Sequence, residues 1–438
     1  MSGDDSGEIR RQYDNYSDAL AVDAFAEAEV AAKQMVTLVL QRPDNEKFDV
    51  SQALINLAAA QQLGGDLDTA MLNYQAAVDN IESQGDLLSQ HLVSPLRGLA
   101  AAQADRDGPV VAVRTLDRAL HISNVNSGPH SSQQVPILES MLQISLEHGD
   151  DASAKNMLER IYTLALREYS LGAEELLPTL MYKARVENQL GMQLAERETY
   201  RQIIKITSRT RGAEDFSLIE PYLKIGRTYV YDAAGESYRS LPTAPTAEWY
   251  FKKAVRIAES SPDSNIRTRS ACLLSLADYY TVVGVEGKAD SLYRYTWKLL
   301  SADDSMHAQR DADLSQLRPL AFRRPHNYAN FGYKSDIHES SPDELLTGVL
   351  TVSYTIEKDG TTTAIEIIEA DPAGFEPMEL RVRQAVKKFV FRPRYIDGEA
   401  TEAADQHYRH EYFYRLSDLP DAVSKARDGA TGKAPQIH

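Results

Sequence analysis

A histidine-containing stretch near the C-terminus is the first place to look for metal or acid–base chemistry. His407, His410 and Glu411 lie within five residues of one another. Successive side chains on a strand alternate between its faces, so His407 and Glu411 would face one way and His410 the other. Ligands that do not converge cannot hold a metal ion together. We therefore expect neither a metal site nor another cofactor here.

The single thiol and the known catalytic motifs give no reacting group either. Cys272 stands in the apolar run Ser270-Ala-Cys-Leu-Leu, where it is most simply a small core residue, and one cysteine excludes an internal disulfide. The chain has no Gly-x-Ser-x-Gly, P-loop, dinucleotide fingerprint or His-Glu-x-x-His motif. We expect a protein without catalytic residues. The competing hypothesis, an enzyme between residues 302 and 416, requires a deep pocket with convergent titratable groups.

A basic cluster without an intervening acid is the strongest charge contrast that we single out. Its members are Arg381, Arg383, Lys387, Lys388, Arg392 and Arg394. In a chain with a formal net charge of -17 such a cluster could bind an anionic partner, or it could be the solvated face of a helix. The overall negative charge disfavours nucleic acid and anionic membranes as partners of the whole surface.

Length and composition indicate several folded units without a membrane span. A chain of 438 residues is too long for one compact core, and 43% apolar with 25% charged residues is ordinary for globular proteins. No run approaches the roughly 18 apolar residues of a membrane helix. The first residues, Met1-Ser-Gly-Asp-Asp, lack the pattern of a leader, and a leader removed upstream would leave no trace.

A repeat of 42 residues organises the chain up to about residue 301. Each copy has a small residue, an aromatic or leucine four positions later and a small or apolar residue three positions after that, as in Ala70, Tyr74 and Ala77. Copies begin at Ala28, Ala70, Ala112, Ala154, Glu196, Ala247 and Ala289. Residues 233–245 supply nine extra residues, which we expect to form a loop between helices.

Each repeat is predicted to be a helical hairpin. Positions three and four apart share one face of a helix, and a second such stripe precedes the first in every copy. Gly65, Gly149, Gly191 and Gly284 lie between the stripes, where a positive φ can end the first helix. One hairpin cannot bury its apolar face alone, so about seven of them would stack into a solenoid.

These repeats resemble tetratricopeptide (TPR) repeats. The Ala-x3-Tyr/Phe/Leu-x2-Ala signature is similar to the second TPR helix, and a period of 42 resembles the longer repeats of kinesin light chain-like proteins. Glu196 departs from the pattern, which expects a small residue there. The resemblance implies a superhelical solenoid with a concave groove for peptides or partner domains. The alternative is that the repeats only hold the ends of the chain apart.

After about residue 302 the period changes to two, which predicts a small β-β-α-β module. Leu350, Val352, Tyr354 and Ile356 alternate with polar residues, and Lys358-Asp-Gly360 forms the turn to a second strand with Ile365 and Ile367. A helix follows with one apolar stripe. The stripe comprises Phe375, Met378, Val382, Ala385, Val386 and Phe389. The last strand covers about residues 403–416.

The module resembles the C-terminal domain of TonB, the periplasmic energy transducer of Gram-negative bacteria. The matching features are Gly348-Val-Leu-Thr-Val-Ser-Tyr-Thr-Ile, Asp359-Gly360, Phe389-x-Phe391-x-Pro393, Gly398 and the closing aromatic strand. The resemblance implies that a receptor peptide pairs with the edge of the last strand. This candidate edge is Gln406, His407, Tyr408, Arg409, His410, Glu411 and Tyr412.

Alternatively, the aromatics of that strand are core residues and Arg409 and Arg415 blunt its edge. The chain also lacks the membrane anchor, the Pro-rich linker and the Tyr-Pro motif of a TonB transducer. Recognition is therefore a better-supported expectation than energy transduction.

The sequence thus predicts a multidomain protein, an all-α TPR-like solenoid followed by a small α+β TonB-like domain. We expect repeats over 1–301, a linker that could hold a capping helix over 302–344, the module over 345–416 and a mobile tail over 417–438. The expected function is a non-catalytic protein interaction scaffold of the bacterial envelope, in the periplasm, that binds envelope proteins and outer-membrane receptor segments. The alternative is a cytoplasmic TPR adaptor with an unrelated α+β domain.

Overall fold

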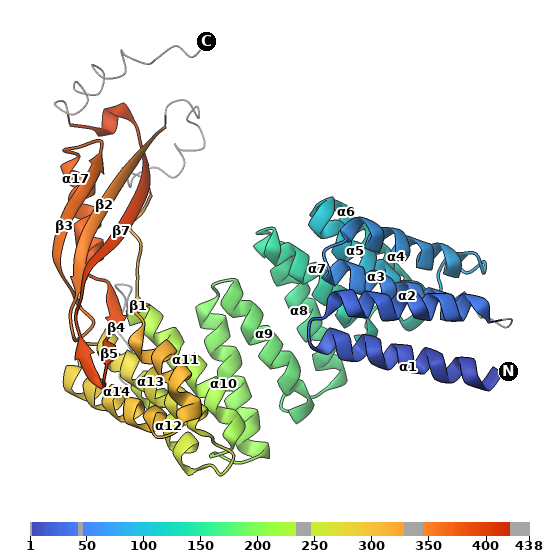
Figure 1. Cartoon of the computed structure of the whole chain (residues 1–438), viewed down its shortest axis with the longest axis horizontal. Coiled ribbons are helices and arrows are strands. Elements are labelled where there is room, and N and C mark those ends of the chain that lie inside the picture. Colours follow the sequence, from blue (N-terminus) through green and yellow to red (C-terminus); the bar gives the residue numbers. More distant parts are fainter. Residues whose placement is uncertain (1, 43–46, 234–246, 328–344, 421–438) are drawn as a thin grey trace. The chain divides into compact units, whose positions relative to one another are not determined.

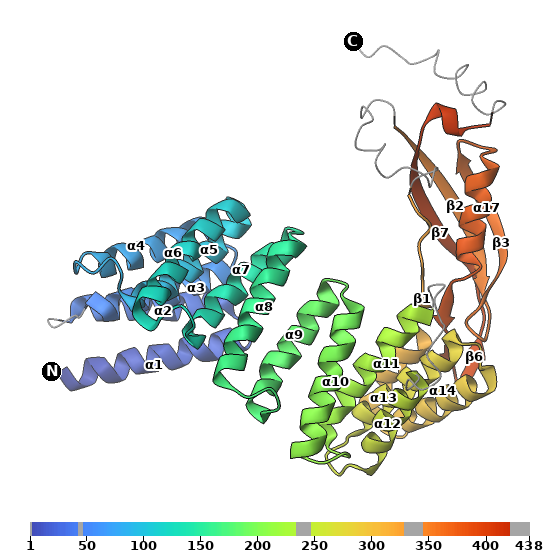
Figure 2. The same cartoon turned by 180° about the vertical axis from the view of Figure 1, so that it is seen from behind.

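The computed structural model describes residues 2–42, 47–233, 247–327 and 345–420 (Figure 1). The chain folds as two compact units, Met1–Ile206 and Thr207–His438, which we call the N-terminal and C-terminal units. The N-terminal unit is helical, and the C-terminal unit combines further helices with every strand of the described residues (Figure 2). The predicted combination of a helical-repeat region with a C-terminal strand-containing region is confirmed.

The helices form consecutive antiparallel hairpins in the phase that the 42-residue pattern predicts. In the N-terminal unit the pairs are α1 (Ser2–Ala21) with α2 (Phe25–Gln41), α3 (Lys47–Leu63) with α4 (Leu67–Glu82), α5 (Val93–Arg106) with α6 (Pro109–Ser127), and α7 (Val135–Glu147) with α8 (Asp151–Glu168). α9 (Leu177–Gln189) precedes α10 (Gln193–Thr210), which contains the boundary between the units. In the C-terminal unit α11 (Ile219–Ala233) pairs with α12 (Ala247–Ser260), and α13 (Ile266–Val282) pairs with α14 (Glu286–Ser301).

The turn inside a hairpin follows from a Gly-Asp pair. Gly65 takes φ +88°, a conformation that side chains with a Cβ rarely adopt, and so ends α3. Asp66 then caps α4, because its carboxylate accepts a hydrogen bond from the backbone N–H of Thr69 at 3.2 Å. Gly149 and Asp150 repeat this arrangement between α7 and α8. The prediction that glycines divide the hairpins is confirmed at these positions.

Small residues let the helices approach each other closely. Ala70 and Ala77 of α4 are fully buried, as are the equivalent alanines of α6. The closest packing involves Gly98 of α5, where a Cβ atom would lie only 2.2 Å from Cε1 of Tyr74. In these two hairpins the repeat pattern therefore marks positions where the helices pack closely.

The strands of the module form a three-stranded antiparallel sheet of order β3-β2-β7. These are β2 (Leu346–Ile356), β3 (Thr362–Asp371) and β7 (Ala403–Tyr414). Helix α17 (Glu376–Val386) covers one face, where Met378, Val382 and Val386 are fully buried against Leu350 and Val352. The predicted β-β-α-β order and the apolar stripe of the helix are confirmed.

Several short elements lie beyond the predicted pattern. The predicted linker contains α15 (His307–Arg310), a π-helical turn η6 (Asp311–Ser315) and β1 (Arg318–Ala321). β1 pairs with β4 (Val390–Arg392), and β5 (Arg394–Ile396) forms a hairpin with β6 (Glu399–Thr401). The rest of that linker, at 328–344, lies outside the described residues, as do most of the predicted insertion loop and of the tail, at 234–246 and 421–438.

Candidate functional site

The central feature of the C-terminal unit is helix α13, which is buried on most of its circumference. It carries the uncharged run from Ser270 to Ala277, and all but one of these residues are buried. One side packs on α12 and α14, and another contacts β1 and β4 of the strand region. The first charged residue after this run is Asp278, which lies where the repeats meet the strands.

Asp278 forms a two-bond ion pair with Arg392 of β4. The Arg392 Nε and Nη2 atoms donate to the two carboxylate oxygens at 2.8 and 2.6 Å, and Nη1 donates to the Asp313 carbonyl at 2.8 Å. Only 3% of the Arg392 side chain is exposed. Burial alone would lower the pKa of Arg392, but the charge and hydrogen bonds of Asp278 raise it overall. Arg392 is therefore charged at every physiological pH.

Tyr293 of α14 completes this polar cluster. Its hydroxyl donates to the Asp278 carboxylate at 2.9 Å and lies 3.0 Å from the Thr281 hydroxyl. Burial raises the pKa of Tyr293 well above its usual value, and the neighbouring Asp278 charge raises it further. The phenol therefore stays neutral and serves as a hydrogen-bond donor rather than as an acid or a base.

A second set of contacts joins α14 to the β5–β6 hairpin. The Tyr395 hydroxyl donates to Asp290 at 2.8 Å, and Arg294 bridges Asp290 and Glu399 at 2.8 and 2.6 Å. Gly398 at the hairpin turn has φ +81° and approaches the Trp297 ring so closely that a Cβ would lie 3.2 Å from its indole nitrogen. These contacts lie between the β5–β6 hairpin and α14, and the buried Tyr395 is the part of them that is shielded from water.

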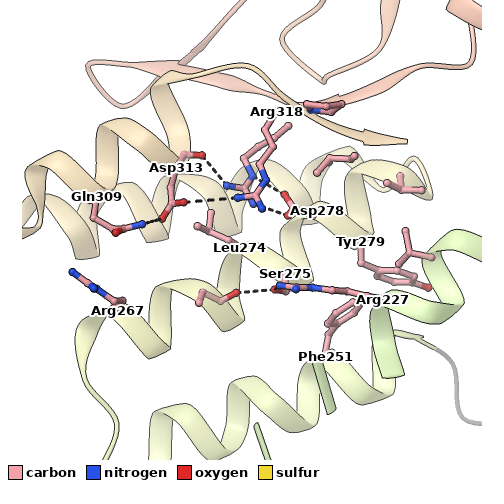
Figure 3. Close-up of a pocket in the computed structure, with 16 residues that line it drawn as sticks. Arg227, Phe251, Arg267, Leu274, Ser275, Asp278, Tyr279, Gln309, Asp313 and Arg318 are labelled. Atoms are coloured by element: carbon pink, nitrogen blue, oxygen red, sulfur yellow. Dashed lines mark hydrogen bonds and ion pairs between the residues drawn. The ribbon is translucent and has the colours of Figure 1, made fainter. Parts of the chain in front are cut away.

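Beside the ion pair lies a cavity of about 300 Å³. Helices α11, α12 and α13 form one side, and the segment from α15 to β1 forms the other (Figure 3). Leu274 and Tyr279 contribute apolar surface, and three exposed arginines stand at its rim: Arg227, Arg267 and Arg318. The cavity is thus built jointly by the helical repeats and the strand region of the same unit.

The predicted edge residues lie on β7, an outer strand of the sheet. Tyr408, His410 and Tyr412 point into the core, whereas His407, Arg409 and Glu411 are exposed on the opposite face, as the alternation predicts. Gln406 is half-buried. β7 pairs with β2 on one side. On its other side, the Phe413 N–H donates to the Asn327 carbonyl at 2.6 Å, so the chain itself covers part of this edge.

The predicted basic cluster does not form one surface. Arg383, Lys387 and Lys388 are exposed at the end of α17, and Arg381 is half-buried. Arg392 is buried in its pair with Asp278, and Arg394 donates to Thr401 Oγ1 and the Glu402 carbonyl. The interpretation of all six as one exposed patch is thus wrong for Arg392, because its side chain is buried, and Arg394 is half-buried.

The remaining reactive groups are core residues. Cys272 is fully buried as expected, and burial raises the pKa of its thiol to about 12. His410 is 3% exposed, and burial lowers the pKa of its imidazole. Among the residues that the structure describes, no three His, Cys, Asp or Glu side chains are grouped to hold a metal. Over the same residues no helix is both long and apolar enough to cross a membrane.

Sequence reasoning missed Asp278, Tyr293 and the rim arginines as members of a site. Asp278 and Arg392 are 114 positions apart, and no periodicity links residues of a helix with residues of a distant strand. The uncharged run before Asp278 was the available signal, because a helix that is apolar all round must be covered on more than one side.

No protein-family model matches the chain, and no curated protein matches its sequence. Solved structures similar to it include nearly identical TPR-like repeats of a kinesin light chain-type protein from Podosopora anserina, with 15% identity and a TM-score of 0.40 over 50% of this chain and 99% of that one. A signal transduction ATPase with a tetratricopeptide repeat sensor from Pyrococcus horikoshii has 14% sequence identity and a TM-score of 0.46. The match covers 72% of this chain and 45% of that one. The C-terminal part of a TPR repeat-containing protein from Cytophaga hutchinsonii has 9% sequence identity and a TM-score of 0.43. The match covers 68% of this chain and 97% of that one.

Proposed function

We propose that this protein is a non-catalytic interaction scaffold whose C-terminal module binds a protein segment by strand addition at the outer edge of β7. The observation that carries the proposal is the position of β7 at the edge of the sheet, in unbroken register with β2 from Gln406 to Tyr414. An outer strand in regular register offers a row of backbone donors and acceptors to an incoming strand.

The orientation of these groups follows from one hydrogen bond. Because the Phe413 N–H points away from β2 to Asn327, the N–H groups of Glu411, Arg409 and His407 point the same way by alternation. Within the described residues no backbone hydrogen bond reaches these three groups from outside the sheet. The binding edge is therefore His407 to Glu411, a shorter stretch than the predicted seven residues.

The opposite edge of the sheet is a poorer template. β3 has two register shifts against β2, and Ala364 takes φ +47° beside one of them. Such bulges interrupt the regular spacing of backbone groups and protect an edge from pairing. A bound strand would therefore select β7 over β3.

The partner class and location rest on the resemblance of the module to the TonB C-terminal domain. We propose envelope proteins and outer-membrane receptor segments as partners, and the periplasm as the location. The helical hairpins in the same chain support a scaffold role, because such repeats present extended surfaces to other proteins. The alternative is a cytoplasmic adaptor with the same binding edge.

The test compares two substitutions of one residue. Arg409→Pro removes the outward N–H without breaking a hydrogen bond to β2, whereas Arg409→Ala removes the side chain and keeps the N–H. Each variant and the unchanged protein are used to capture proteins from envelope and cytosolic extracts of a Gram-negative bacterium. We expect the unchanged protein and Arg409→Ala to capture the same envelope proteins, and Arg409→Pro to capture none of them.

Two results would contradict parts of the proposal. Equal capture by both variants would show that the β7 edge is not used. Capture of cytosolic proteins alone, with the same difference between the variants, would favour the cytoplasmic adaptor and remove the envelope assignment.

A further inference from the structure

The cavity beside Asp278 carries an excess of positive charge in a protein that is acidic overall. Four arginines and two aspartates line it, which leaves a formal charge of +2, whereas the whole chain has -17. It shares no residue with the β7 edge. An unbalanced group of guanidinium ions around a concave surface attracts carboxylates, because their fork of donors matches the two carboxylate oxygens.

Of the two aspartates, Asp278 is already paired with Arg392, and Asp313 offsets only one of the three rim charges. Asp278 is held by Arg392 and Tyr293. Asp313 accepts a hydrogen bond from Gln309 Nε2 at 2.7 Å (Figure 3). Its other carboxylate oxygen lies 4.0 Å from Arg318 Nη1, at the outer limit of an ion pair.

The three rim arginines make few hydrogen bonds or ion pairs within the described residues. Arg227 Nη2 reaches only a neutral oxygen, Ser275 Oγ, at 3.4 Å. Arg267 is exposed, and its guanidinium has no hydrogen bond or ion pair within the described residues. Arg318 is also exposed and has only the long contact with Asp313. Three guanidinium groups from α11, α13 and β1 therefore surround the cavity with their donors largely unused.

Apolar side chains form part of the lining between these charges. Leu274 and Tyr279 of α13 and Val282 at its end contribute to the lining, together with Leu320 of β1. A volume of about 300 Å³ is at the lower end for a ligand site and accommodates one or two amino-acid side chains. The combination suits a ligand that has an apolar side chain next to carboxylates.

We propose that this cavity binds an acidic segment of a partner protein, with one apolar side chain in the cavity and flanking Asp or Glu carboxylates on Arg227, Arg267 and Arg318. Charge complementarity selects this occupant. The net negative charge of the chain disfavours acidic peptides over most of the remaining surface.

The experiment uses the full chain and a phage library of random eight-residue peptides. Selection is carried out on the unchanged protein, on the double variant Arg227→Gln/Arg318→Gln, and on Arg256→Gln as the matched control. Arg256 is an exposed arginine of α12 that does not line the cavity. Since all three substituted residues are exposed, the thermal unfolding midpoints should agree and exclude a folding defect.

The expected result is enrichment of Asp and Glu next to an apolar residue on the unchanged protein and on Arg256→Gln, and loss of that enrichment on the double variant. A synthetic peptide of the selected sequence should bind the double variant at least tenfold more weakly, since each charge-assisted hydrogen bond contributes this order. Replacing its acids by Gln and Asn should have the same effect.

Selected peptides without acidic enrichment, or acidic enrichment that survives in the double variant, would overturn the proposal. Binding at the β7 edge is read out separately, because Arg409→Pro should leave the selection of acidic peptides unchanged.

Discussion

The pair of Asp278 and Arg392 is predicted to hold the strand region on the last helical hairpin. Replacing Asp278 by Asn preserves the shape of the side chain and removes its charge. The Arg392 guanidinium, 3% exposed, is then left with the Asp313 carbonyl and a neutral amide. Removing one partner of a buried ion pair costs about 3–5 kcal/mol. Because the Asp278 side chain is 21% exposed, we expect a value near the lower end, about 3 kcal/mol.

Trp297 offers a local reporter for this contact. It is half-buried on α14, its ring lies 6.5 Å from that of Tyr395, and Arg310 stacks on it at 4.6 Å. Trp249 is the second tryptophan of the chain, so Trp249→Phe leaves Trp297 as the single tryptophan, which excitation at about 295 nm selects over the tyrosines. A urea titration in this background follows the C-terminal unit alone, which matters because a chain of two units does not unfold in one step. Asp278→Asn should lower the urea midpoint of the Trp297 transition.

Two further variants test whether the lower midpoint comes from the unpaired buried charge of Arg392. Glu399→Gln removes an exposed ion pair with Arg294 and should leave the midpoint unchanged, since such pairs contribute little. The double variant Asp278→Leu/Arg392→Met removes both buried charges and should recover much of the loss. An unchanged midpoint for Asp278→Asn, or a double variant as unstable as the single one, would show that the buried pair does not hold the strand region in place.

Three other predictions follow from burial and packing. Gly98→Ala should destabilise the N-terminal unit by about 1–3 kcal/mol in thermal unfolding, because its Cβ would overlap Tyr74, whereas Gly287→Ala, with open space around it, should not; equal melting of the two would contradict this. Burial lowers the pKa of His410 below its unfolded value, so its contribution to stability is present above about pH 6.5 and is lost as the pH falls below that value. His410→Phe should reduce the fall in the urea midpoint between about pH 7.5 and 5.5, and an undiminished fall would argue against it. The thiol of Cys272, whose pKa burial raises to about 12, should react with DTNB at about pH 8 only after unfolding, and fast reaction of the native protein would disprove its burial.

The repeats and the order of the module could be predicted because both depend on local periodicity. Ala70, Tyr74 and Ala77 recur at intervals that only a helix face explains, and the glycine at position 65 takes the predicted positive φ. In the module, the alternation from Leu350 to Ile356 reports a sheet with one covered face. The residues that form such a pattern lie within a few positions of one another, so the pattern can be recognised in a single sequence.

The candidate site could not be predicted, since its members come from distant elements. Arg392 looked like a member of a basic helix face, yet β4 brings it under Asp278. The pairing of β1 with β4 and the two bulges of β3 depend on packing that no short pattern reports. Which N–H groups of β7 point outward could not be predicted, because their direction follows from the contact of Phe413 with Asn327.

We propose that β7 binds its partner through its outward backbone groups. Hydrogen–deuterium exchange of the full chain, alone and with a purified partner from the capture experiment, tests this most directly. We expect slower exchange of the amides of His407, Arg409 and Glu411 in the complex, with α17 unchanged. Unchanged exchange along β7 in a complex that nevertheless forms would contradict it.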